Sequence, residues 1–177
     1  MITNKWDQRY LELAKHIASW SKDPSTKTGA VIVRPDKTVA SIGYNGFPKS
    51  MPDNDNLYAN RDEKYSRIVH CEMNAVLHAK EQLEGYTLYT YPFMSCDRCF
   101  QHMVQAGITR FVAPVATQEQ LTRWGPAFDK VRQYARECSV ELVEVQLQQE
   151  QEGEVNGNGS TSNEEGTNPS AKGNNNV

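Results

Sequence analysis

The stretch His70-Cys71-Glu72, followed 24 residues after the glutamate by Cys96-Asp97-Arg98-Cys99, decides the fold and the chemistry expected of this chain. His70, Cys96 and Cys99 offer one imidazole and two thiolates, which are typical zinc ligands. Structural zinc sites are closed by four protein ligands, whereas catalytic sites keep three and leave one position open. Three ligands beside the spare carboxylate of Glu72 therefore predict a catalytic zinc site.

Glu72 is the predicted catalytic acid and base. Zinc held by one imidazole and two thiolates lowers the pKa of its water toward neutrality. The three ligands with a spare glutamate resemble the signature of the zinc nucleobase deaminases, which implies attack on a ring carbon that carries an exocyclic amine. Such a carbon is a poor electrophile, so the neighbouring ring nitrogen and then the leaving amine must each receive a proton. One carboxylate two residues from a ligand can carry both protons. The Cys-x-x-Cys spacing places both sulfurs in the first turn of a helix, where unpaired N–H groups and the helix dipole favour thiolates.

Other interpretations of the cysteines remain open at this stage. A Cys-x-x-Cys pair can be a redox dithiol or half of a structural zinc finger. The finger would need a second Cys-x-x-Cys or a His-x-x-x-His, and the sequence has neither, since His78 and His102 are wrongly spaced. Cys71 and Cys138 are expected to be core thiols and not ligands.

The composition predicts one domain, residues 1–149, followed by a disordered tail, residues 150–177. The tail is rich in Asn, Gly, Ser and Glu and cannot bury enough apolar surface to offset the entropy of ordering it. It holds five of the 22 acidic and one of the 19 basic residues, so residues 1–149 carry 17 acids, 18 bases and a net charge of +1. This near-neutral domain argues against nucleic acid as a partner.

The chain also lacks the signals of secretion and membrane insertion. No apolar run approaches the roughly 20 residues that span a bilayer, and the first residues lead directly into a helical pattern without a signal peptide. Four cysteines, two of them in a metal-like pair, indicate a reducing compartment. We therefore expect a cytoplasmic protein without a membrane partner.

Hydrophobic periodicity predicts an α/β fold with three α-β-α layers and a mixed five-stranded sheet. The expected helices cover residues 4–20, 70–83, 96–106 and 118–137, and the expected strands cover 29–33, 39–43, 86–90, 109–113 and 140–145. Residues 44–65 are expected to form a loop that is long enough to indicate a function. Helix starts that meet at one end of such a sheet are a natural place for a site, and both zinc-ligand segments begin helices.

Together these segments resemble the deoxycytidylate (dCMP) deaminases, including phage-encoded ones, over roughly residues 5–146. The motifs are Ser21-Lys-Asp-Pro-Ser-Thr-Lys-Thr-Gly-Ala-Val-Ile-Val33, Gly43-Tyr-Asn-Gly-Phe-Pro48, His70-Cys-Glu-Met-Asn-Ala75, and Cys96-Asp-Arg-Cys99 with Gln105-Ala-Gly-Ile108. The zinc motif is shared by all zinc nucleobase deaminases, whereas the first two motifs are more specific. The resemblance implies a cytidine deaminase-like fold and hydrolysis of dCMP to dUMP and ammonia, which supplies dTTP synthesis in the cytoplasm, or in the host cytoplasm for a phage protein.

The resemblance and the residue types also indicate substrate contacts. Thr28, at the start of the first strand, is expected to contact the base, and the adjacent Gly29 would let the backbone approach a flat ligand. Asn45 resembles the superfamily asparagine that bonds the sugar hydroxyl. Two hydroxyls and a cation suit a 5′-phosphate, namely those of Ser25, Thr26 and Lys27, although Asp-Pro-Ser is equally an ordinary turn.

Regulation is implied by the resemblance alone. In this family the Gly-Tyr-Asn-Gly-Phe-Pro segment is associated with an effector site in a homohexamer, with activation by dCTP, bound with Mg²⁺, and inhibition by dTTP. The candidate effector-binding residues are Gly43, Tyr44, Gly46 and Phe47, although the segment could equally be a tight turn. The extra cysteines with which some phage relatives bind a second zinc are absent, which predicts one Zn²⁺ per subunit.

Two positions depart from the family pattern. Ser95 stands where a proline usually precedes the first zinc cysteine, so the turn from strand to helix is expected to differ. Many relatives carry an aromatic residue near the nucleotide after the fourth strand, and residues 114–118 lack one. Trp124 could supply that ring from the next segment or could be a core residue.

Three alternatives keep the zinc and change the function. A nucleic-acid deaminase could use Arg61, Lys64 and Arg67 as a basic rim, although such a row is also typical of a solvated helix face. A deaminase of free nucleosides or of the riboflavin pathway would not explain the segment that begins at Gly43. A zinc-stabilised regulatory domain without activity is argued against by the intact Glu72.

Overall fold

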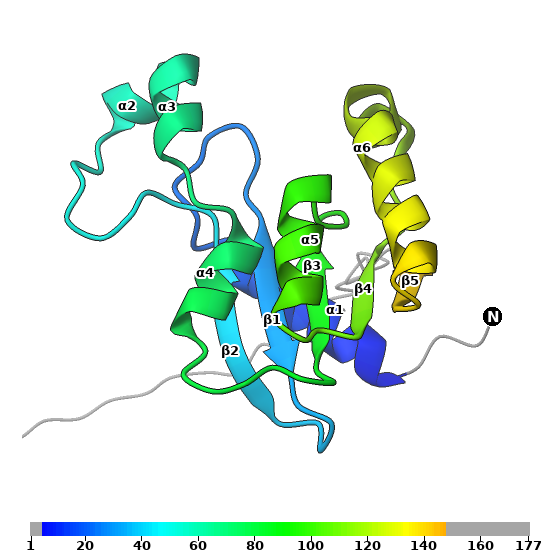
Figure 1. Ribbon diagram of the computed structural model, residues 1–177. Coiled ribbons are helices and arrows are strands. Elements are labelled where there is room, and N and C mark those ends of the chain that lie inside the picture. The colour runs from blue at the N-terminus through cyan, green and yellow to red at the C-terminus, as the bar shows by residue number, and fades with distance from the viewer. Residues whose placement is uncertain (1–4, 148–177) are drawn as a thin grey trace, which may run out of the picture.

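The computed structural model describes residues 5–147 (Figure 1). The predicted disordered tail, residues 150–177, lies outside the described residues. A mixed five-stranded sheet forms the centre, with strands β1 (Gly29–Val33), β2 (Val39–Tyr44), β3 (Thr87–Tyr91), β4 (Arg110–Pro114) and β5 (Glu141–Val145). Their order is β2-β1-β3-β4-β5. Strand β1 pairs antiparallel with β2 and β3, whereas β3, β4 and β5 are parallel, which confirms the predicted mixed sheet.

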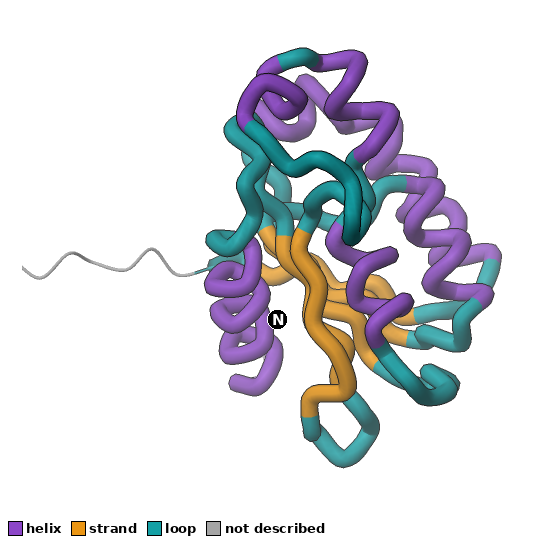
Figure 2. Tube along the Cα trace, turned by 90° about the vertical axis from the view of Figure 1, so that its left-hand side faces the viewer, coloured by secondary structure: helices purple, strands orange, loops and turns teal. Residues whose placement is uncertain are grey.

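Helices cover both faces of the sheet, as the three-layer prediction requires. Helix α1 (Lys5–Ala18) packs on one face, and α4 (Cys71–His78), α5 (Asp97–Gln105) and α6 (Gln118–Glu137) pack on the other (Figures 1 and 2). Because successive residues of a strand point to opposite faces, the fully buried β1 serves both cores. Val31 and Val33 pack with α1, whereas Ala30 and Ile32 pack with α4 and α5.

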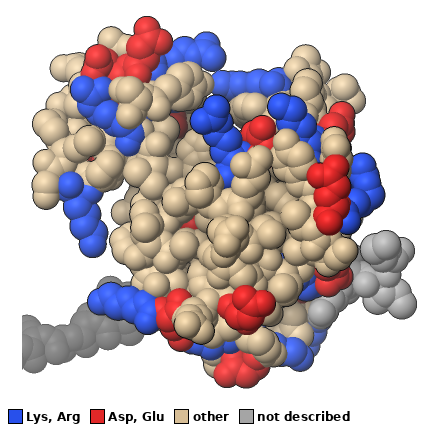
Figure 3. Space-filling model, in the orientation of Figure 1, with Lys and Arg blue, Asp and Glu red and all other residues tan. Residues whose placement is uncertain are grey.

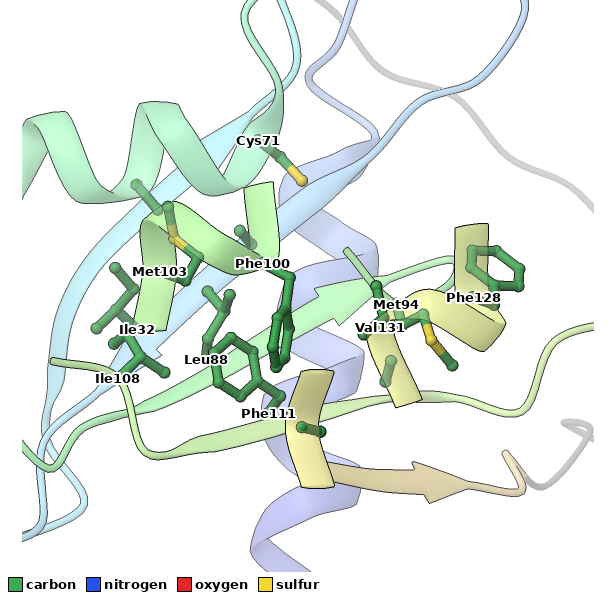
Figure 4. Close-up of a cluster of buried hydrophobic side chains, with 14 of the residues drawn as sticks. Ile32, Cys71, Leu88, Met94, Phe100, Met103, Ile108, Phe111, Phe128 and Val131 are labelled. Atoms are coloured by element: carbon green, nitrogen blue, oxygen red, sulfur yellow. The ribbon is translucent and has the colours of Figure 1, made fainter. Parts of the chain in front are cut away.

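The larger core lies between the sheet and the helices α4 to α6. Figure 4 shows Leu88 and Phe111 of the sheet beside Phe100 and Met103 of α5. The rings of Phe100 and Phe111 lie 4.4 Å apart between their centroids. Helix α6 contributes Val131 to the same cluster. This packing fixes the positions of α4 and α5, the two helices that begin at the predicted zinc ligands.

The predicted loop at residues 44–65 is partly wrong. It contains two short helices, α2 (Asp55–Ala59) and α3 (Arg61–Arg67), which stand together above the end of the sheet (Figures 1 and 2). Asn54 and Asn60 cap them, because each side-chain oxygen accepts a hydrogen bond from a backbone N–H in the first turn. Both helices are too short and too polar to show a helical period, so periodicity alone does not find them.

The zinc helix α4 is also shorter than predicted. It ends at His78 and not at residue 83. The chain then turns back and buries Leu83 in the core cluster, so this leucine, whose spacing fits a continued helix, packs from the following turn. The remaining bounds agree within about two residues, and α6 has the predicted bounds. Within residues 5–147 no helix is long and apolar enough to cross a membrane.

Candidate active site

The three predicted zinc ligands converge at the starts of two helices. His70 is the N-cap residue of α4 and Cys96 that of α5, while Cys99 lies in the first turn of α5. The Nδ1 atom of His70 lies 3.6 Å from the Sγ atom of Cys96 and 3.3 Å from that of Cys99. The three ligand atoms all lie within 4.8 Å of one another. Tetrahedral zinc with ordinary ligand distances requires nitrogen and sulfur to be roughly 3.6 Å apart, so these residues fit the ion.

The local electrostatics also favour metal binding. Hydrogen bonds from Cys99 and His70 lower the pKa of the Cys96 thiol to about 4, and the helix N-terminus supplies the backbone N–H of Cys99 to the same sulfur at 3.4 Å. The hydrogen bond with Cys96 raises the pKa of His70 to about 9. The neighbouring Cys96 raises the pKa of Cys99. A bound cation would favour the thiolate form of both cysteines.

Glu72 lies in the first turn of α4, beside the ligand cluster. Its side chain is only 5% exposed and lines the same cavity as His70 and Cys96. The thiol of Cys71 donates a hydrogen bond to Oε2 of Glu72 over 3.2 Å. Burial, followed by the neighbouring Glu72, raises the pKa of Cys71, which stays a neutral donor. Cys71 is thus buried in the core, as predicted, and in addition holds the orientation of the carboxylate.

One wall of the cavity is polar and is organised by Asn45. The Oδ1 atom of Asn45 accepts from the backbone N–H of Thr28 at 2.8 Å, and its Nδ2 donates to the carbonyl of Thr26 at 2.9 Å and to Asp23 at 3.3 Å. Both N–H donors of the amide are therefore in use, and one lone pair of Oδ1 is left. Asn45 can bind a substrate hydroxyl only as an acceptor.

A buried ion pair completes the polar wall. Lys64 of α3 is 4% exposed, and its Nζ donates to Asp23 at 3.0 Å and to the Oγ atom of Ser25 at 2.9 Å. Asp23 also accepts from the backbone N–H groups of Ser25 and Thr26, which forms the predicted turn. The lysine that the sequence suggested for an exposed basic rim therefore anchors α3 to the loop before β1.

The opposite wall is aromatic. The rings of Phe93 and Trp124 lie 4.6 Å apart, and Phe128 lies 5.8 Å from Phe93. The guanidinium of Arg123 stacks over the Trp124 ring at 4.5 Å. All four residues line the cavity, together with Tyr91. Trp124 is half-buried and packs against the core while also facing the cavity, so both interpretations of this residue describe part of its role.

Comparison with known proteins identifies the family of this site. Residues 4–115 match the model of the cytidine and deoxycytidylate deaminase zinc-binding region. The chain belongs to this family of zinc-dependent deaminases. It is 35% identical to an uncharacterized deaminase in the luxG 3′ region of Aliivibrio fischeri over 82% of this chain and 97% of the relative. It is 33% identical to a deoxycytidylate deaminase of Mycobacterium phage D29 over 62% of this chain and 94% of that one.

The fold is shared with a solved structure. The dCMP deaminase of cyanophage S-TIM5, in complex with dCMP and dUMP, matches with a TM-score of 0.65 and 20% identity over 82% of this chain and 100% of that one. The prediction of a cytidine deaminase-like fold is confirmed. The chain spans 55% of the matched Caenorhabditis elegans relative and 64% of the human one.

The deaminase cavity includes most of the predicted substrate residues. Thr28, Asn45, Thr26 and Ser25 line it, whereas Lys27 is not among the lining residues. Other residues that line it carried no predicted substrate role, namely Asp23, Tyr65, Ile68, Tyr91, Phe93, Met94, Arg123, Ala127 and Phe128. Of these only Asp23 lies in one of the motifs quoted above.

The predicted role of Gly29 is wrong. A Cβ atom at Gly29 would lie 2.2 Å from the carbonyl oxygen of Ala14 and 2.5 Å from the amide nitrogen of Ala18. The glycine is thus needed for the close approach of α1 to β1 and not for a flat ligand. Cys138 is likewise exposed and not a core thiol, because it follows the end of α6.

The four candidate effector residues do not line the deaminase cavity, although Asn45, which lies between them in the sequence, does. Gly43 packs against α4, since a Cβ there would lie 2.4 Å from the carbonyl oxygen of Cys71. Tyr44 is exposed, and Phe47 stacks on Tyr58 with 4.1 Å between ring centroids. Gly46 exchanges two backbone hydrogen bonds with Val69. The segment therefore holds the residue that precedes the ligand His70.

Proposed function

We propose that this protein hydrolyses dCMP to dUMP and ammonia, with one zinc ion bound by His70, Cys96 and Cys99. The observation that carries the proposal is the buried carboxylate of Glu72 in a cavity that is also lined by His70 and Cys96 of the ligand cluster. The phage relative named deoxycytidylate deaminase supports dCMP as the substrate. Zinc, when bound, acts as a Lewis acid that makes water nucleophilic near neutral pH.

The chain's own residues position the substrate and move the protons. Glu72 takes a proton from the attacking nucleophile, delivers it to the ring nitrogen beside the reacting carbon, and carries a second proton to the leaving ammonia. Cys71 holds the carboxylate by its hydrogen bond. Thr28 contacts the base, the free lone pair of Asn45 accepts from the sugar hydroxyl, and Ser25 and Thr26 offer hydroxyls toward the phosphate. The aromatic wall excludes water from one face of the base.

The proposed enzyme is also regulated by nucleotides and forms an oligomer in the cytoplasm. We infer that Mg²⁺-bound dCTP activates and dTTP inhibits a cytoplasmic homohexamer through Gly43, Tyr44, Gly46 and Phe47. The hydrogen bonds between Gly46 and Val69 support this, since a ligand that moved the segment would move the lead into His70. Sedimentation velocity should give a hexamer, and added dCTP with Mg²⁺ should lower the half-saturating dCMP concentration. A monomer whose kinetics ignore both nucleotides would refute this part.

The first experiment measures ammonia release from dCMP, dCTP, deoxycytidine and a short single-stranded DNA. We expect turnover of dCMP. Glu72→Gln should reduce turnover by several orders of magnitude while the protein keeps its zinc, measured by metal analysis, because Glu72 is not a ligand. Cys99→Ser should lose the metal. Glu12→Gln, which removes an exposed carboxylate on α1, is the matched control and should behave as the wild type. Full turnover by Glu72→Gln, or activity on DNA alone, would contradict the proposal.

A further inference from the structure

Two side-chain cations line the cavity besides the ligand histidine, and they differ in what already binds them. Lys64 is buried and its ammonium is engaged by Asp23 at 3.0 Å and by Ser25 at 2.9 Å. The carboxylate of Asp23 cancels the charge of Lys64 at this wall. A dianionic group of a ligand would meet a neutral pair there.

Arg123 is the cation that remains available. It lies in α6, lines the cavity and is exposed. In the described part of the chain its side chain forms no ion pair or hydrogen bond with the protein, and its guanidinium stacks over Trp124 at 4.5 Å. Such stacking orders the guanidinium plane while leaving its N–H donors free. Arg123 is thus a positioned donor without an acceptor.

The shape of the cavity fixes which end of a bound nucleotide lies deep inside it. The reacting base must lie next to the buried Glu72 and the zinc ligands, so the far end of a nucleotide lies toward the exposed rim that Arg123 shares. Figure 3 shows Lys and Arg side chains gathered along the top of the molecule, where Figure 1 places the space between the α2–α3 pair and α6. The planar fork of an arginine matches two phosphate oxygens at once.

We propose that Arg123 binds the 5′-phosphate of the nucleotide and makes the enzyme prefer a nucleoside monophosphate to the free nucleoside. This inference rests on the proposed function and assigns the cationic part of the phosphate contact to α6, because Lys27 does not line the cavity. The hydroxyls of Ser25 and Thr26 face the same cavity from the other wall. The phosphate is then held between the loop before β1 and the first turns of α6.

The test compares Arg123→Gln with the wild type on dCMP and on deoxycytidine. The variant should lower kcat/KM for dCMP roughly 10- to 100-fold, mostly through KM, as expected for losing hydrogen bonds to a charged group. It should leave kcat/KM for deoxycytidine unchanged. Arg123→Lys keeps the charge and loses the planar fork, so its kcat/KM for dCMP should lie between those of Arg123→Gln and the wild type. Arg136→Gln is the matched control, because Arg136 is exposed on the same helix about 20 Å along it, and it should match the wild type on both substrates.

The outcomes separate this inference from the proposed function. An equal loss on both substrates would overturn the inference, since it would mean that Arg123 acts by holding Trp124. No change on dCMP would overturn it too. A wild-type protein that does not deaminate dCMP would refute the proposed function instead. The phosphate contact is then tested by calorimetry, which measures the binding of dCMP and deoxycytidine to Glu72→Gln with and without Arg123→Gln. Binding of dCMP that is no tighter than that of deoxycytidine, or no weaker after Arg123→Gln, would overturn the phosphate contact.

Discussion

Replacing Lys64 by methionine should destabilise the protein strongly, because it leaves the Asp23 carboxylate buried without its counter-ion. Both side chains are 6% exposed, and the ammonium and carboxylate lie 3.0 Å apart. At an effective dielectric constant of about 20, two charges at this distance attract by roughly 5 kcal/mol. Removal of one partner from a buried pair typically costs about 3–5 kcal/mol. For a chain of this size that loss lowers the Tm by roughly 6–20 °C.

A double-mutant cycle measured by urea denaturation tests the reasoning. Asp23→Asn together with Lys64→Met removes both charges and keeps an oxygen for the turn, so the double variant should be more stable than the sum of the two single losses implies. Lys22→Met is the matched control, because Lys22 pairs with Asp53 on the exposed surface, where ion pairs contribute little. A loss below about 1 kcal/mol for Lys64→Met, or single effects that simply add, would refute the view that this pair anchors α3.

Three further predictions concern stability. Gly29→Ala should cost about 1–3 kcal/mol or more, because its Cβ would lie 2.2 Å from the carbonyl oxygen of Ala14; unchanged urea denaturation would contradict this. Burial and the Asp7 carboxylate raise the pKa of Tyr89, whereas an unfolded tyrosine ionises near pH 10. The free energy of unfolding should therefore fall as the pH rises above about 10, by up to roughly 1.4 kcal/mol per pH unit, and Tyr89→Phe should flatten that slope in denaturation between pH 9 and 11; an identical slope would show that folding does not raise the pKa of Tyr89. Ser95→Ala should raise the free energy of unfolding by about 1 kcal/mol, and with it the urea midpoint, because the buried Oγ has no hydrogen-bond partner in the described part of the chain. A lower urea midpoint would show that the hydroxyl is needed.

The elements that sequence predicts well are those with long, regular patterns. Helix α6 has the predicted bounds, since its 20 residues carry a sustained apolar period and follow the capping residue Thr117. The five-residue β1 is buried on both faces and reads as a continuous apolar run. The short helices α2 and α3 escape prediction, because five and seven mostly polar residues give no measurable period.

The candidate site divides in the same way. The ligands His70, Cys96 and Cys99 lie in two local motifs whose spacing follows from the chemistry of the ion, so residue types and spacing are enough to identify them. The residues of the two cavity walls do not lie in a comparable local motif. Asp23 and Lys64 are 41 residues apart in sequence, and Arg123 lies on the opposite wall from both.

The sequence by itself determined the candidate donor set, the carboxylate beside it, and the order of the five strands and four longer helices along the chain, because each depends on residue types at short, fixed spacings. Only the tertiary structure decided that Lys64 is neutralised by Asp23 while Arg123 remains available, and that Gly29 makes room for α1 and not for a ligand. The physical reason is that burial and charge pairing arise where separate segments pack on the sheet. No local pattern in the chain records which side chains meet there.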